Sequence, residues 1–260
     1  NFETPDYSGG LITYMRTDST TLSEESLQQA RQVILSEYGI EYALKKPRRF
    51  ATTAKGAQEA HEAIRPVDLS MKPQDVRAHL SPEMAKLYDL VWKRMIACQM
   101  TDAIIARTTL KLEGGNQKEC LLEVKGQRLV FPGFLKAYTE GSENPDADLE
   151  KKDVILPKVE KGEELGINEV IPEQHFTKPP PRYTEAGLIK KLEAEGVGRP
   201  STYAPTISTI QDRQYAERGE DKRLRPTDLG EVVTDYLVNH FTDIVNLNFT
   251  ARIEEDLDEI

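Results

Sequence analysis

The chain has 260 residues, 38% of them hydrophobic and 30% charged, so it can bury a core and is neither disordered nor collagen-like. Its formal charge of −10, taken alone, argues against a nucleic-acid partner. Cys98 and Cys120 form no metal-type pair, which argues against a disulfide framework and a structural zinc site. We expect a soluble cytoplasmic protein without membrane contact, because no run approaches the roughly 18 apolar residues of a membrane-spanning helix.

The first patterned segment is residues 9–17, GGLITYMRT. Its alternation predicts a strand with Tyr14 and Arg16 on one face, followed by a polar turn. A serine and two glutamates at 23–25 then predict the start of a helix, which ends at Gly39.

Two further helices are expected before residue 101. A short one covers 57–64 and is ended by Pro66, whose ring cannot continue a helix. A longer one begins at 81–82 and runs to about Gln99, with apolar side chains at helical spacing. Residues 1–100 are therefore expected to form a mostly helical domain that carries Tyr14.

From about residue 101 the hydrophobic pattern changes to period two, which is typical of strands. Glycine-containing and acidic breaks separate the segments. The expected strands are 106–113, 120–126, 127–134 and 153–157, with one more over 163–176. Three prolines in 178–182 forbid regular structure there. Residues 101–180 are therefore expected to be β-rich.

The last region, 181–260, is again helical. A glycine turn at 196–198 between two helices suggests helix-turn-helix geometry. The expected elements are a helix from Thr184 to Glu195, a helix capped by Ser201 to about Gln211, a hairpin over 214–225 and a helix capped by Thr227 to Leu237. This order is typical of a winged helix, so the expected fold class is α+β with several domains.

Charge is segregated within this last region. Residues 227–260 contain nine acidic side chains and one basic, whereas 178–225 contain ten basic and seven acidic. The stretch 178–225 is therefore a candidate polyanion contact in spite of the overall charge.

Tyr14 lies with Arg16, Asp18 and Ser19 in one short segment. A strand tyrosine usually serves packing, but a tyrosine hydroxyl can attack phosphorus when a base, a cation or a metal favours its phenolate form. An arginine two residues away could hold a phosphate oxygen and stabilise the charge of an in-line displacement. Both interpretations of Tyr14 stay open from this segment alone.

The segment HEAIRP at 61–66 resembles a zinc-binding HExxH motif only superficially, because Arg65 stands where the second histidine would be. The metal interpretation therefore fails. On the predicted helix, His61 and Arg65 would share one face and would suit a phosphate. An ordinary surface helix is the alternative.

Residues 196–213 combine a glycine turn, a helix start, four hydroxyl side chains and two flanking arginines. Helix starts attract phosphate, and hydroxyls, amides and arginines are the usual groups that position a nucleic-acid backbone. The pattern favours DNA binding, with a protein-interaction module as the alternative.

Four segments together resemble the type IA DNA topoisomerases. They are GLITYMRTDST at 10–20, QEAHEAIRP at 58–66, HFTKPPPRYTEAGLIKKLE at 175–193 and GVGRPSTYAPTISTIQDR at 196–213. The segments occur in family order and span nearly the whole chain, so together they are specific where each alone would only be suggestive. Met15 is the feature that resembles bacterial topoisomerase I within this family.

The resemblance implies that Tyr14 is the nucleophile that forms a 5′-phosphotyrosine bond, that Arg16 contacts the scissile phosphate and that His61 belongs to the active site. It also implies contacts to mainly single-stranded DNA from Asp18, Ser19, Arg65, Arg199, Ser201, Thr202 and Arg213. The implied activity is that of an ATP-independent isomerase that cleaves and rejoins one DNA strand and relaxes negative supercoils, as a monomer in the bacterial nucleoid.

By the same resemblance, residues 1–100 match the tyrosine-bearing domain, 101–180 part of a β arch that lets it swing, and 181–260 part of a winged-helix domain. The family's Toprim domain, which binds Mg²⁺, precedes this region, and nothing in the chain resembles it. Both ends look cut, so we expect no metal site in these residues and no DNA cleavage by them alone. A winged-helix regulator without catalysis and a protein-interaction scaffold are the competing hypotheses.

Overall fold

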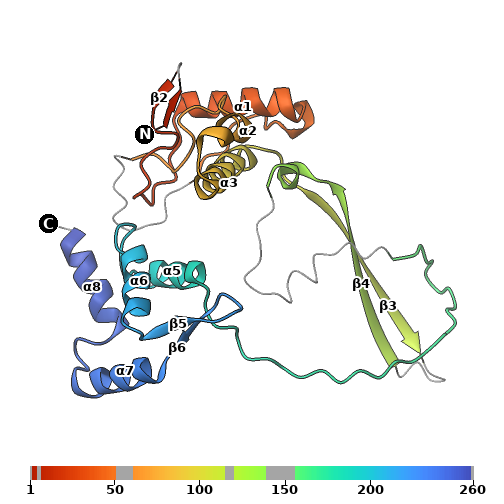
Figure 1. Cartoon of the computed structure of the whole chain (residues 1–260). Helices are drawn as coiled ribbons and strands as arrows, with labels where there is room; N and C mark the ends of the chain where they lie inside the picture. Colours follow the sequence, from red (N-terminus) through yellow and green to blue (C-terminus); the bar gives the residue numbers. More distant parts are fainter. Residues whose placement is uncertain (1, 5–6, 51–60, 115–119, 139–155, 259–260) are drawn as a thin grey trace. The chain divides into compact units, whose positions relative to one another are not determined.

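The computed structural model describes residues 2–4, 7–50, 61–114, 120–138 and 156–258 (Figure 1). Helices are combined with small two-stranded sheets, so the fold is mixed α+β. The chain divides into two compact units, residues 1–99 with 181–260 and residues 100–180, and each is described by itself. Within the described ranges, no helix is long and apolar enough to cross a membrane.

The two long helices of residues 1–99 begin and end where their caps predict. α1 (Glu24–Glu37) is capped by Ser23, whose hydroxyl accepts a hydrogen bond from a backbone N–H of the first turn. The chain turns after α1 at Gly39, which has a φ of 105°. α3 (Pro82–Cys98) has an equivalent cap at Ser81. Both predicted helices are confirmed.

Packing of α1 against α3 forms the core of this part. The buried apolar side chains are Leu27, Ala30 and Ile34 from α1 and Tyr88, Trp92, Met95 and Ile96 from α3. Short elements complete it: β1 (Phe2–Thr4), β2 (Tyr7–Gly9), η1 (Ile40–Tyr42), α2 (Pro73–Val76) and η2 (Arg77–His79). The indole N–H of Trp92 donates to the Leu69 carbonyl at 3.1 Å, so the core also fixes the chain leading to α2.

Segment 9–17 is not the strand that its alternation predicts. Gly9 is the last residue of β2 and pairs with Phe2, but among the described residues the rest of the segment has only an isolated bridge between Ile12 and Pro66. The backbone groups of this segment bond to an irregular loop, which offers no continuous edge on which a ladder could grow. Tyr14 and Arg16 therefore do not share a strand face.

The helix predicted over 57–64 is wrong for the residues of this range that the structure describes, 61–64. Its first four residues lie outside the described ranges, and its last four are not helical. The N–H of Ala63 donates to the Thr21 carbonyl at 2.8 Å instead of to a carbonyl one helical turn earlier. Tertiary hydrogen bonds override the local helical pattern here, so His61 and Arg65 do not lie one turn apart on a helix.

In the unit 100–180, β3 (Ile104–Gly114) and β4 (Cys120–Phe131) form a long antiparallel ribbon (Figure 1). The sequence predicts two separate strands, 120–126 and 127–134, but β4 runs through without a turn. Gly126 pairs with Thr108 and keeps the ladder continuous.

The strand predicted over 163–176 is absent, and these residues are exposed and irregular. The strand predicted over 153–157 has its first three residues outside the described ranges, and its last two are not in a strand. An extended segment forms a strand only when a neighbour satisfies its backbone groups, and the described part of this unit pairs β3 with β4 alone. The ribbon is followed by η3 (Gly133–Lys136). Residues 178–182 are irregular, as their prolines predict.

Residues 181–260 follow the predicted order of helix, turn, helix, hairpin and helix. The elements are α5 (Glu185–Ala194), α6 (Tyr203–Asp212), β5 (Ala216–Arg218), β6 (Leu224–Pro226), α7 (Asp228–His240) and α8 (Leu247–Asp258). Thr184 and Thr227 cap α5 and α7 as predicted. The turn before α6 contains Gly196 and Gly198 with φ of 72° and 87°, a region that glycine adopts without strain.

The start of α6 differs from the prediction by one residue. Ser201 is not its cap, because Thr202 is the residue that precedes the first helical position. The hydroxyl of Thr202 accepts a hydrogen bond from the Arg199 N–H at 2.8 Å, so it stabilises the preceding turn and leaves the first helical N–H groups without a side-chain cap.

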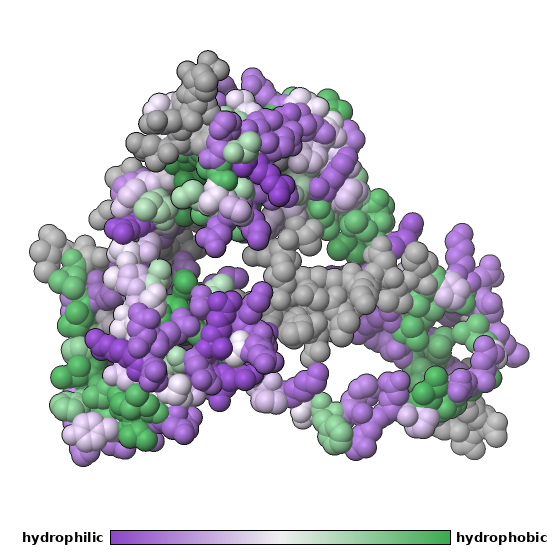
Figure 2. Space-filling model, viewed as in Figure 1, coloured by the Kyte–Doolittle hydropathy of each residue, from purple (hydrophilic) through white to green (hydrophobic). Residues whose placement is uncertain are grey.

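The helices of residues 181–260 bury few large side chains. Figure 2 shows hydrophobic residues gathered on the surface over α7 and α8, and the exposed ones include Val232, Phe241, Leu247 and Leu257. Ile207 of α6 is one of the few apolar side chains that are buried. Stability in this part therefore depends on close backbone packing at a few points.

One such point gives a prediction for Gly230, in the first turn of α7. A Cβ at this position would lie 2.0 Å from the Tyr215 carbonyl oxygen. Helix propensity favours alanine over glycine by about 1 kcal/mol, whereas the clash must move backbone and costs roughly 1–3 kcal/mol. We expect Gly230→Ala to lower the midpoint of thermal unfolding. Gly166→Ala, which meets nothing within 4 Å, is the control, and a raised midpoint for Gly230→Ala would contradict the packing.

Candidate active site

Two aromatic rings from distant parts of the sequence lie against each other in residues 1–99. The rings of Tyr14 and His61 are stacked, with centroids 4.8 Å apart and planes inclined by 26°. Tyr14 is 49% exposed, so one partner covers part of its ring while the rest faces solvent. The arrangement holds a tyrosine hydroxyl in an accessible place beside an imidazole.

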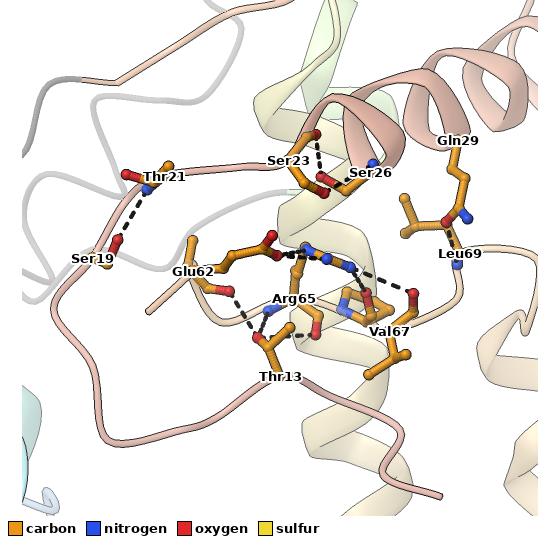
Figure 3. A network of polar contacts seen from close by, with 12 residues as sticks. Thr13, Ser19, Thr21, Ser23, Ser26, Gln29, Glu62, Arg65, Val67 and Leu69 are labelled. Carbon is orange, nitrogen blue, oxygen red and sulfur yellow. Dashed lines mark hydrogen bonds and ion pairs between the residues drawn. The ribbon is translucent and has the colours of Figure 1, made fainter. Parts of the chain in front are cut away.

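The loop 61–67, which carries His61, is tied to the chain on both sides of Tyr14, and Figure 3 shows its contact with Thr13. The N–H of Thr13 donates to the Arg65 carbonyl at 2.9 Å, and the N–H of Val67 donates to the Leu11 carbonyl at 3.0 Å. On the other side, the Thr21 carbonyl accepts from the loop at 2.8 Å. Three points of attachment fix the loop where no regular element exists.

Arg65 is used inside this loop. Its Nε donates to Glu62 Oε2 at 2.8 Å, and Nη1 donates to the Pro66 carbonyl at 2.8 Å. The Arg65 side chain is only 13% exposed. The sequence predicts Arg65 as a DNA contact, but its charge is paired and its donors point at the protein, so its geometry favours a role in shaping the loop.

The residues after Tyr14 form a compact polar turn. The N–H of Ser19 donates to the Thr17 hydroxyl at 3.0 Å, and the Ser19 hydroxyl accepts from the Thr21 N–H at 3.2 Å. Ser19 is buried, so its side chain stabilises the turn. Arg16 is exposed, and among the described residues no ion pair engages it. Its side chain is therefore open to solvent in the segment that carries Tyr14.

A second group of predicted residues lies around the turn before α6. Arg199 Nη1 lies 3.1 Å from Glu254 Oε2, and the Gly198 N–H donates to the other oxygen of the same carboxylate at 3.1 Å. Burial, followed by the nearby charge of Glu193, raises the pKa of Tyr203 in this turn. The structure thus places an acidic side chain of α8 on the donors that the sequence assigned to a phosphate.

The other predicted contacts of this region are exposed. Ser201 and Thr202 lie at the surface before α6, and Arg213 lies at its other end. These residues flank one helix, α6, and they are distant from Tyr14 and His61 in the sequence.

Tyr14 lines neither of the two hollows found among the described residues. Two hollows of about 240 and 750 Å³ are lined by residues of α1, α2 and α3, and neither Tyr14 nor His61 lines them. Within the described ranges, no three His, Cys, Asp or Glu side chains gather as a metal ion would require. These residues therefore do not fit the Mg²⁺ that the resemblance implies. An open surface beside a reactive side chain suits a polymer better than a small molecule.

A protein-family model described as DNA topoisomerase matches residues 7–260. The chain belongs to the type IA DNA topoisomerases. It is 46% identical over 251 residues to DNA topoisomerase 1 of Rickettsia bellii and 46% identical over 253 residues to that of Xylella fastidiosa. These alignments cover 96% and 97% of this chain and 31% of each relative. The chain thus spans about a third of the length of these topoisomerases.

The solved structure of full-length topoisomerase I from Thermotoga maritima resembles this chain, with a TM-score of 0.73 and 33% sequence identity. The match covers 99% of this chain and 40% of that one. The resemblance to type IA topoisomerases, drawn from four motifs, is therefore confirmed, including the likeness to bacterial topoisomerase I.

Sequence reasoning missed two residues of this topoisomerase chain. Thr13, which joins the loop to the tyrosine segment, reads as an ordinary β-branched residue of a strand. Glu254 lies within a run of acidic residues on α8, and nothing in the run distinguishes it from its neighbours. Only the fold shows what either side chain contacts.

The Arg65 geometry predicts a structural effect. In Arg65→Leu, Glu62 and the Pro66 carbonyl lose their partner, so we expect the loop to lose roughly 1–3 kcal/mol of stability. Amide exchange at Ala63 should become faster, and the unfolding midpoint should fall. Arg16→Leu is the matched control, because the same change at an exposed arginine that pairs with no acidic residue of the described ranges should leave both unchanged. Equal behaviour of the two variants would contradict the structural role.

Proposed function

We propose that the chain carries the DNA-cleaving tyrosine of a type IA topoisomerase, which breaks and rejoins one strand and thereby relaxes negative supercoils. The observation that carries the proposal is the exposed Tyr14 stacked on His61, beside an exposed arginine. Membership of the topoisomerase family supports it.

In the proposed reaction, the Tyr14 hydroxyl loses its proton and its oxygen attacks the scissile phosphorus. A phosphotyrosine bond forms at the 5′ end, the bond from phosphorus to the 3′ oxygen breaks, and that oxygen takes up a proton. One phosphodiester replaces another, so the reverse reaction reseals the strand without ATP. In this proposal Arg16 stabilises the charge on the phosphate oxygens, and His61 orients the tyrosine ring on which it stacks.

In the longer enzyme, Mg²⁺ would assist this chemistry by stabilising negative charge on the phosphate. The described residues form no acidic cluster for a metal, so a Toprim domain would have to supply one. We accordingly propose that these 260 residues alone bind DNA without cleaving it.

We further propose that residues 181–260 act as a winged-helix-like module that holds single-stranded DNA. The order of helix, turn, helix, hairpin and helix supports this, as do the exposed Ser201, Thr202 and Arg213. Asp18 and Ser19 would form part of the DNA path near Tyr14 through their backbone, since Ser19 is buried. Arg199 would join the DNA contacts after it releases Glu254.

Removing the nucleophile tests the reaction directly. Tyr14→Phe in the full-length protein should abolish covalent attachment to DNA, because the attacking oxygen is lost, while DNA affinity stays within a few-fold because the ring remains. Labelled single-stranded DNA, recovered after denaturation, measures the adduct. A variant that still forms the adduct would exclude Tyr14 as the nucleophile.

Releasing Arg199 tests the proposed DNA contact. Glu254→Gln removes the charge that pairs with Arg199, so we expect tighter single-strand binding and a steeper salt dependence, by up to about 0.7 in slope for one added phosphate contact. Asp256→Asn removes the same charge from an exposed position of α8 and is the matched control. Filter binding at several salt concentrations measures both. Equal effects of the two variants would show that only net charge matters.

A further inference from the structure

The Thr13 hydroxyl joins the two segments that carry the stacked rings. Its Oγ1 donates to the Ala63 carbonyl at 2.7 Å and accepts from the Arg65 N–H at 3.0 Å (Figure 3). Thr13 directly precedes Tyr14, and Ala63 follows two residues after His61. One hydroxyl thus donates to a backbone carbonyl of the loop and accepts from a backbone N–H of the same loop.

The backbone bonds between residues 11–13 and the loop attach it farther along the chain from His61 than Ala63 does. The backbone bonds from Thr13 to Arg65 and from Val67 to Leu11 hold the end of the loop that is remote from His61. The bond between the Thr13 hydroxyl and Ala63 is the one that reaches from the residue beside Tyr14 toward His61. Without this bond, the bond from Ala63 to Thr21 is the one of these attachments that still holds the half of the loop next to His61.

We propose that Thr13 is a positioning residue for cleavage: its hydroxyl sets where the His61 ring lies against Tyr14. This inference deepens the proposed function and rests on it. Thr13 does not touch the reacting atoms in this mechanism and acts through the histidine. A displacement of about 1 Å in a group near the reacting centre is enough to lower a rate substantially, up to about 100-fold.

Two substitutions separate the hydroxyl from the shape of the side chain. Valine keeps the branched shape and loses every hydrogen bond of Oγ1, including the longer contact of 3.5 Å to the Arg65 carbonyl, whereas serine keeps the hydroxyl and loses the methyl group. The backbone bond from Thr13 to Arg65 remains in both variants, so the loop keeps its remote attachment.

The experiment measures the single-turnover rate of adduct formation and the affinity for a single-stranded oligonucleotide in the full-length protein. We expect Thr13→Val to lower the rate roughly 10- to 100-fold with affinity within about 3-fold of wild type. Thr13→Ser should restore most of the rate. A wild-type rate for Thr13→Val would overturn the proposal, and so would a valine variant that fails to fold, since the hydroxyl would then serve the fold itself.

A double-mutant cycle with His61→Ala distinguishes positioning from a general structural effect. If Thr13 acts through His61, Thr13→Val should cost less than about 3-fold in the His61→Ala background. An equal loss in both backgrounds would overturn the proposal. Tyr14→Phe tests the proposed function separately. If Tyr14→Phe still forms the adduct, the proposed function is wrong. If Tyr14→Phe forms no adduct but Thr13→Val reacts at the wild-type rate, only the positioning role is wrong.

Discussion

Backbone hydrogen bonding between residues 11–13 and the loop 61–67 is the constraint on which the geometry of the candidate site depends. Neither segment belongs to a helix or a strand, so their polar groups must be satisfied by each other. Pro66 is buried in this contact, and its missing N–H removes one group that would otherwise need a partner. Residues about fifty positions apart are thereby held as closely as neighbours in a sheet.

Most of the regular structure could be predicted from local chemistry. Ser23, Ser81, Thr184 and Thr227 each cap a helix, because a hydroxyl beside free N–H groups is a signal contained in a few adjacent residues. The strand expected over 163–176 did not form. Its alternating pattern does not show whether another strand lies beside it to pair with its backbone. The break expected after Gly126 did not form for a related reason. A strand tolerates a glycine when the neighbouring strand provides hydrogen-bonding partners for its backbone.

The candidate site could be predicted only in part. Motifs identified Tyr14 and His61, and the fold brings these two together. The motifs could not distinguish the surroundings of Arg16 from those of Arg65, since both arginines lie close in sequence to a candidate catalytic residue. In the structure, Arg16 is exposed, whereas Arg65 is enclosed by a carboxylate and backbone carbonyls. Burial separates an arginine that can bind a phosphate from one that holds a loop, and burial is a property of the folded chain.

The contact of Glu254 with the turn before α6 has a kinetic consequence. A carboxylate attached to the same chain is an intramolecular competitor, and its effective concentration at the turn stays high whatever the amount of DNA present. A phosphate bound there would exchange with a competitor that never diffuses away. Under the proposed function, such a contact would shorten the residence time of a DNA strand at Gly198 and Arg199, because the carboxylate is always present to displace the phosphate.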